Sequence, residues 1–121
     1  MSQPPSFGSD GNEYLPKLSD GQTIVIKILK KPETYMDPEY GLKYQMKIKV
    51  LDGMDECLNH VLLWSSISGA LKQLYEYMEI SENNVASCMK HNWNLTGKAS
   101  PNNPNIIKYR LVPQGEGDPR V

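Results

Sequence analysis

Lysine and arginine side chains alternate with apolar ones in two stretches of the sequence, and this arrangement suits phosphate binding. In the first stretch Lys43, Lys47 and Lys49 alternate with apolar residues, and in the second Lys108 and Arg110 do so. Because successive side chains of a β-strand point to opposite faces, each stretch predicts a strand with a basic face. A row of basic side chains neutralises the phosphates of a nucleic acid strand.

The net charge of the chain is −1 over 121 residues, but it is unevenly distributed. Residues 22–50 and residues 91–113 each carry +3, whereas residues 51–90 carry −4. Lys27 adds to the positive charge within the first of these ranges. The near-neutral total excludes a protein that coats nucleic acid by charge alone, and the division favours a domain with one basic surface.

Three aromatic residues are candidates for stacking on nucleobases. Tyr35 and Tyr40 lie in a segment rich in Pro, Gly and Asp, which predicts an exposed loop. Trp64 ends an apolar run and is the strongest candidate of the three. Stacking of a base on an aromatic ring contributes about 1–3 kcal/mol and tolerates any base. The alternatives are that the tyrosines cover the core and that Trp64 anchors it.

The order of periodicities predicts a mainly β domain with one helix. Strands are expected at residues 23–31, 42–51, 58–64, 93–99 and 106–112, and an amphipathic helix at residues 67–78, with a short second turn over 81–89 as an option. The order β-β-β-α-β-β is that of the OB-fold, a five-stranded, partly open Greek-key barrel whose second and third strands bind oligonucleotides or oligosaccharides. A generic α+β roll fits this order less well.

Residues 14–113 are expected to form the single domain. Residues 1–13 and 114–121 are poor in core-forming residues and are expected to be disordered tails. The first residues have the pattern of neither a signal peptide nor a membrane span, so we expect an intracellular protein that does not bind membranes. The two cysteines are too few for a disulfide framework and are expected to be reduced.

Two segments resemble known single-strand-binding proteins. Residues 60–66, with Ala70 and Leu71 after them, resemble the third strand and helix entry of replication protein A-like OB-folds. That resemblance implies that Trp64 stacks on single-stranded DNA. Residues 93–98 and 108–113 resemble the closing hairpin of small single-stranded-DNA-binding OB proteins of archaea and phages.

The chain departs from this pattern in two respects. The usual glycine and aromatic pair of the first strand are not evident, and the C-terminal segment has only Glu116 and Asp118 as acidic residues. The latter are too few for the acidic partner-binding tip of bacterial single-strand binders. Trp93 and Tyr109 alternate in step with apolar residues, so we expect both in the core.

Cysteine and histidine recur at the same spacing, as Cys57-x-x-His60 and Cys88-x-x-His91, and four such ligands suit a tetrahedral zinc site. Residues three apart in a strand point to opposite faces, and the inferred topology separates the two pairs, so we expect no zinc site. The carboxylates within residues 52–56 lie in a predicted turn, where solvation accounts for them. The sequence contains none of the common catalytic motifs, and we expect no enzymatic activity.

The leading hypothesis is a cofactor-free protein that binds single-stranded DNA with little sequence preference and supports DNA replication or repair, where other replication or repair proteins are further candidate partners. The residues expected at the interface are Lys27, Lys43, Lys47, Lys49, Lys108 and Arg110 for phosphates, and Tyr35, Tyr40 and Trp64 for bases. Two alternatives stay open: an OB-fold module that binds another protein of a nucleic-acid-processing assembly, and a protein that binds single-stranded RNA.

Overall fold

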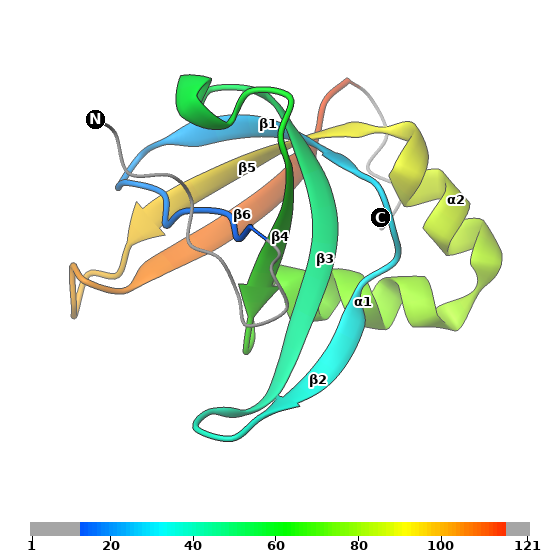
Figure 1. Ribbon diagram of the computed structural model, residues 1–121, viewed down its shortest axis with the longest axis horizontal. Coiled ribbons are helices and arrows are strands. Elements are labelled where there is room, and N and C mark those ends of the chain that lie inside the picture. Colours follow the sequence, from blue (N-terminus) through cyan, green and yellow to red (C-terminus); the bar gives the residue numbers. More distant parts are fainter. Residues whose placement is uncertain (1–12, 116–121) are drawn as a thin grey trace.

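Six antiparallel strands and two α-helices make up residues 13–115, which are the residues that the computed structural model describes (Figure 1). In chain order the elements are β1 (Thr23–Ile28), β2 (Glu33–Asp37), β3 (Gly41–Asp52), a 3₁₀ helix (Asp55–Cys57), β4 (Val61–Ser66), α1 (Ala70–Ile80), α2 (Glu82–Lys90), β5 (Asn92–Ala99) and β6 (Ile107–Pro113). The expectation of a mainly β chain is confirmed, with one more strand and one more helix than expected. Of the expected tails, only residues 13, 114 and 115 lie within the described part of the chain.

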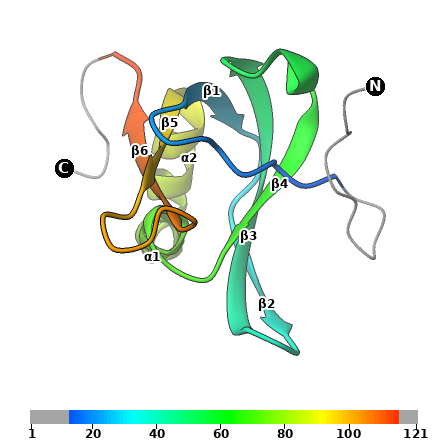
Figure 2. The ribbon, with the colours of Figure 1, turned by 90° about the vertical axis from the view of Figure 1, so that its left-hand side faces the viewer.

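The strands form one open sheet. Its order is β2-β3-β1-β5-β6, and β4 pairs with the other edge of β3. Figure 2 shows β5 and β6 on one side and β3 and β4 on the other, with β1 joining them at the top. Within residues 13–115, β4 and β6 do not pair, so the sheet curves around the core without closing. We call the interval between β4 and β6 the seam.

The expected first strand and the loop after it are wrong in part, because β2 lies in the segment predicted as a loop. Pro32 has no backbone N–H and a fixed φ, and it separates β1 from β2. β3 begins at Gly41 and is long enough to pair with both, β2 at its start and β1 at its end. Tyr35 therefore lies in a strand, opposite Lys43.

The helical segment is divided in two. Gly69 has a φ of 79° at the start of α1, so Ile67, expected in the helix, lies before it and is 51% exposed. Ser81 separates the helices and caps α2, because its hydroxyl oxygen accepts a hydrogen bond from the N–H of Asn84 at 3.2 Å. Among the described residues, no helix has the length and apolar character needed to cross a membrane.

The core lies between the inner face of the sheet and the two helices. Its fully buried side chains include Ile24, Ile26, Ile28, Met46, Ile48, Leu71, Leu74, Met78, Trp93 and Leu95. Trp93 is 0% exposed, which confirms its expected place, and its indole N–H donates to the carbonyl of Cys88 at 2.9 Å. Tyr109 packs against the core and is half-buried.

An extended N-terminal segment, residues 13–18, crosses the seam, and we call it the N-terminal strap. The N–H of Leu15 donates to the carbonyl of Leu63 on β4 at 2.8 Å. Farther along, the N–H of Leu18 donates to the hydroxyl of Tyr109 on β6 at 3.3 Å, and the Leu18 side chain is 1% exposed. The strap thus links the two strands that do not pair with each other.

Candidate nucleic-acid interface

Three lysines lie together on the outer face of β1 and β3, and we call this surface the basic face. In the register of the two strands Lys27 lies directly opposite Lys49, and Lys47 follows on the same side of β3. The residues between them, such as Ile26 and Ile48, are fully buried on the other side of the sheet. The alternation seen in the sequence therefore produces this surface.

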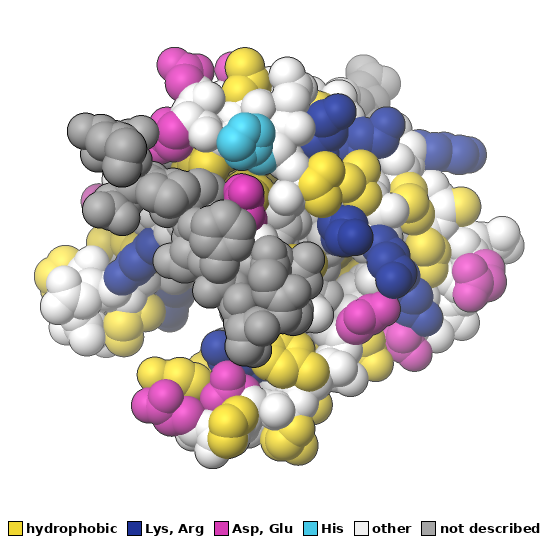
Figure 3. Space-filling view, in the orientation of Figure 1, with side chains coloured by type: hydrophobic (Ala, Val, Ile, Leu, Met, Phe, Trp, Pro, Cys, Tyr) yellow, Lys and Arg dark blue, Asp and Glu magenta, His cyan; other side chains and the backbone are white. Residues whose placement is uncertain are grey.

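The basic face holds positive charges at short range. Side chains that lie opposite each other in an antiparallel pair have Cβ atoms about 4.5–5.5 Å apart, and like charges there are destabilising. Within residues 13–115, neither Lys27 nor Lys49 nor Lys47 is in an ion pair. Figure 3 shows Lys and Arg side chains spread over β1, β3 and the connection that follows β1. An anion such as a phosphate would relieve this repulsion.

Tyr35 lies at one end of the basic face. It is opposite Lys43 in the β2–β3 register, so its ring is on the same side of the sheet as the lysines. Its hydroxyl is 3.0 Å from the hydroxyl of Ser65 on β4, which fixes the ring across β3. The ring is half-buried and has an exposed part beside the basic face.

Lys43 and Tyr40 belong to the tip of the β2–β3 hairpin. The ammonium of Lys43 is 3.8 Å from a carboxylate oxygen of Asp37 and 5.1 Å from the centre of the Tyr40 ring. Tyr40 is 60% exposed. Lys43 already has an anionic partner, so it is a weaker phosphate ligand than the lysines of the basic face.

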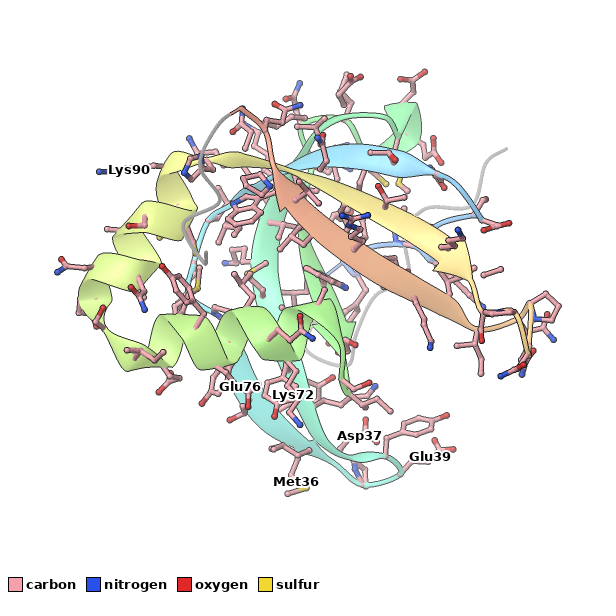
Figure 4. The ribbon with its side chains drawn as sticks, turned by 180° about the vertical axis from the view of Figure 1, so that it is seen from behind. Met36, Asp37, Glu39, Lys72, Glu76 and Lys90 are labelled. Atoms are coloured by element: carbon pink, nitrogen blue, oxygen red, sulfur yellow. The ribbon has the colours of Figure 1, made fainter. Side chains whose placement is uncertain are left out.

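Asp37 shapes the hairpin tip. Its Oδ1 accepts hydrogen bonds from the N–H groups of Tyr40 at 2.9 Å and Glu39 at 2.8 Å. These bonds, with the charge of Lys43, hold the pKa of Asp37 below its ordinary value. Figure 4 shows Asp37 and Glu39 at the projecting end of the hairpin, well away from Lys90 on α2.

Lys108 and Arg110 do not join the basic face, because β5 lies between β6 and β1 and their register partners Lys98 and Thr96 are far along β5 from Asn92, the partner of Lys27. Lys108 and Arg110 flank a separate groove of about 830 Å³, which we call the β6 groove. β6 forms one wall of the groove, and the connection from β4 to α1, with Ser66 and Ile67, forms the other. The expected continuous phosphate track is thus divided into two surfaces.

Trp64 lies at the bottom of the β6 groove, and its expected stacking on DNA is contradicted by its burial. It is 3% exposed and meets the ring of Tyr109 edge to face, with ring centres 5.9 Å apart. Its register partner is Met46, whose side chain points into the core. The indole N–H is buried and has no hydrogen-bond partner among the described residues. Trp64 is a core residue whose edge lines the groove.

The two cysteines are free and buried in the core. Burial, with smaller contributions from Glu56 and Glu13, raises the pKa of the Cys57 thiol above its ordinary value. His60 lies 3.7 Å from the carboxylate of Glu13, and His91 packs against Trp93. In the part of the chain that the structure describes, no three His, Cys, Asp or Glu side chains are placed to hold a metal ion.

Several residues of these surfaces were not expected from the sequence. Ser65 orients Tyr35, and Ile67 and Ile106 are exposed apolar residues at the rim of the β6 groove. The only sequence signal for the isoleucines is an apolar side chain next to Ser/Gly-rich or Asn/Pro-rich residues, where polar side chains prevail.

Comparison of the chain with known protein families, curated proteins and solved structures finds no match.

Proposed function

We propose that the chain is an OB-fold protein that binds single-stranded DNA with little sequence preference. The strand connections support the OB assignment. β1 and β2 lie along one edge of β3 and count as a single interrupted strand, which gives five strands with the helices between the third and the fourth. The OB barrel is partly open, and its second and third strands bind oligonucleotides. Here β3 and β4 take those two places.

The observation that carries the proposal is the Lys27–Lys49 pair on the outer face of the sheet, with Lys47 beside it. Lys47 and Lys49 lie on the second strand of the proposed barrel, where an OB domain holds its oligonucleotide, and Lys27 lies beside them on the first strand. From the position of Lys43, which is opposite Tyr35 at the end of the basic face, the strand advances six residues to Lys49, or about 20 Å at about 3.3 Å per residue. The basic face is therefore long enough to follow a strand of several nucleotides.

The proposal assigns a role to each residue of the surface. Lys27, Lys47 and Lys49 would contact phosphates, and Tyr35 and Tyr40 would stack on bases at the hairpin end of the face. Contacts of this kind read the backbone and the flat faces of bases, so they give little sequence preference. The proposal places the protein in DNA replication or repair, requires no cofactor and assigns no catalytic activity.

The test is a titration of fluorescent oligothymidine at several salt concentrations, followed by anisotropy. Three phosphate contacts predict a slope of about −2 for log affinity against log salt, and five predict about −3.5, at about −0.7 per contact. Removal of two lysines in the variant Lys27→Ala/Lys49→Ala should weaken binding and flatten the slope by about 1.4. An affinity that does not depend on salt would contradict the proposal.

A matched control removes the same charge from a helix. The variant Lys72→Ala changes one exposed lysine of α1, the helix that lies in front of the sheet when the molecule is seen from behind (Figure 4), and it is compared with the single variant Lys27→Ala. The Lys72→Ala variant should bind oligothymidine almost as the unchanged protein does. An equal loss in both variants would show that only net charge matters.

Tyr35 tests stacking separately from charge. Tyr35→Leu should weaken binding by about 1–3 kcal/mol, the range for one stacked base. Tyr35→Phe keeps the ring and removes only the contact with Ser65, so it should retain most of the affinity. A parallel titration with oligouridylate decides between DNA and RNA, since tighter binding of the RNA would favour the RNA alternative.

A further inference from the structure

The edge of β6 that faces the groove has unpaired backbone groups. At the two ends of the β5–β6 pair, Ser100 N–H donates to Ile106 and Gln114 N–H donates to Asn92, each at 2.8 Å. In an antiparallel pair such bonds occur at every second residue, so the alternate residues of β6 point their N–H and C=O away from β5. Ile107 and Tyr109 are two of these residues, and no backbone group of either bonds to a described residue across the seam.

The side chains around this edge are apolar and basic. Ile67 and Ile106 are each 51% exposed, and Val112 is 38% exposed. Lys108 and Arg110 are exposed, and among residues 13–115 neither is in an ion pair. The β6 groove thus combines an open strand edge, apolar contacts and two free positive charges.

The other end of the seam already holds an extended segment. The N-terminal strap pairs in parallel with β4 at Leu63 and reaches Tyr109 on β6. The β6 groove begins farther along β4, at Trp64 and Ser66. The strap therefore shows, within this chain, that the seam accepts extended polypeptide, and the β6 groove continues the same interval.

We propose that the β6 groove binds an extended segment of a partner protein, in which acidic side chains alternate with apolar ones, as an added strand on β6. The main chain of that segment would pair with Ile107 and Tyr109, which is how peptides add to open sheet edges. Its acidic side chains would meet Lys108 and Arg110 on one side of the new strand. Its apolar side chains would lie on the other side, toward Ile67 and the ring of Tyr109, because Ile106 and Val112 share the face of Lys108 and Arg110.

The chemistry of the groove favours a peptide over the nucleic acid that the basic face would hold. A nucleic acid strand has no alternating N–H and C=O groups to pair with a strand edge, and it leaves the exposed side chain of Ile67 without an apolar partner. A peptide satisfies both needs. Lys108 and Arg110 would attract either polymer, so the experiment includes an arm for DNA.

The experiment uses the full chain and defined hexapeptides as probes. Fluorescent peptides of Glu alternating with Ile or Val are compared by anisotropy with peptides that carry Lys in place of Glu, and with acidic peptides N-methylated at alternate amides. The acidic peptides should bind at least ten times more tightly than the other two sets. Equal binding of acidic and basic peptides, or of N-methylated and unmethylated ones, would overturn the proposal.

Amide hydrogen exchange identifies the edge that is used. The bound acidic peptide should slow the exchange of the Ile107 and Tyr109 amides at least tenfold, since these N–H groups point into the groove. Binding without this protection would overturn the added-strand geometry. If oligothymidine protects the same two amides, the groove belongs to the nucleic acid and the proposal fails.

Two charge variants separate this proposal from the proposed function. Lys108→Glu/Arg110→Glu should abolish peptide binding and leave most oligothymidine binding, whereas Lys27→Ala/Lys49→Ala should weaken oligothymidine binding and leave peptide binding unchanged. Both pairs are exposed or half-buried on strand surfaces, so both variants are expected to fold. If the groove variant loses both ligands, the proposal of a separate peptide site is overturned. If the basic-face variant keeps its affinity for oligothymidine, the proposed DNA-binding function is contradicted and the peptide proposal is not affected.

Discussion

The core is covered in different ways on the two sides of the curved sheet. On one side β1 pairs with both β3 and β5, and the pairing continues across the three strands with one register shift, between Val25 and Ile26. On the other side β4 and β6 do not pair, and the N-terminal strap and the contact between Trp64 and Tyr109 cover the core instead. A continuous ladder leaves its outer face free to carry charge, whereas the seam relies on side chains and leaves strand edges available for a partner.

The two buried tryptophans show the difference at the level of single atoms. Trp93, behind the continuous side, is 0% exposed and its N–H donates to Cys88 at 2.9 Å. Trp64, at the seam, is 3% exposed, and its N–H has no partner among the described residues. Both rings fill the core, but only one has its polar atom satisfied.

The largest predicted effect comes from replacing these tryptophans. Each Trp→Ala change should lower the free energy of unfolding by about 3–5 kcal/mol. The Phe variants discriminate between the sites, because Trp93→Phe loses a hydrogen bond of about 0.5–1.5 kcal/mol, whereas Trp64→Phe removes an unsatisfied donor that costs about 1–3 kcal/mol. Trp64→Phe should therefore be the more stable variant by about 2 kcal/mol in urea unfolding. Equal stabilities would mean that the two sides of the sheet are alike.

A smaller effect is expected from the link between the strap and β6. Tyr109→Phe removes the hydroxyl that accepts from Leu18, and it should cost about 0.5–1.5 kcal/mol. Hydrogen exchange should become faster at Leu18 and stay unchanged at Ile26, whose strand is paired on both sides. Equal acceleration at both amides would show that the seam does not open on its own.

On the continuous side, where β1 pairs with β3 and β5, a substitution is expected to raise the free energy of unfolding. Lys49→Glu places a carboxylate opposite Lys27 and should raise the free energy of unfolding by about 0.2–1 kcal/mol, because repulsion is replaced by attraction. The same variant should bind oligothymidine more weakly. The double variant Lys27→Glu/Lys49→Glu restores like charges and serves as the control, since it should show no gain in stability.

The smallest effect concerns Asp37, which lies beyond both sides in the hairpin tip. Its pKa is lowered in the folded state, so its contribution to stability is complete above its ordinary pKa of 3.8 and is lost as the pH falls through the folded value. The amide signals of Glu39 and Tyr40 should follow this titration by NMR, and Asp37→Ala should abolish it. A simultaneous shift at Lys49 would mean that the tip and the basic face are coupled.

The sequence predicts the continuous side well and the seam poorly. The alternation around Lys47 and Lys49 predicts β3 and its outer face, because a period of two residues determines which side chains share a side. β2 was missed because Pro32 and the turn residues around it predict a loop, and its pairing depends on how far β3 extends. The length of β3 cannot be predicted from the local propensities of the residues that form β2.

The position of Trp64 depends on long-range contacts. The alternation correctly separates Leu62 and Trp64 from Val61 and Leu63, but both sets are apolar, and the strap buries Leu63 as well. Only the partner strand decides which set faces the core. The strap itself has no periodicity to detect, and for the same reason the separation of Lys108 and Arg110 from the basic face required the three-dimensional structure.

The N-terminal strap also sets an order of events during synthesis on the ribosome. Leu18 is separated by 91 residues from Tyr109, the residue that fixes it to β6. At about 5–20 residues per second, the strap waits about 5–20 s before its partner emerges. During that interval Leu18 lacks its contact with Tyr109, so the strap is made early and is fixed to β6 only when the last strand has been made.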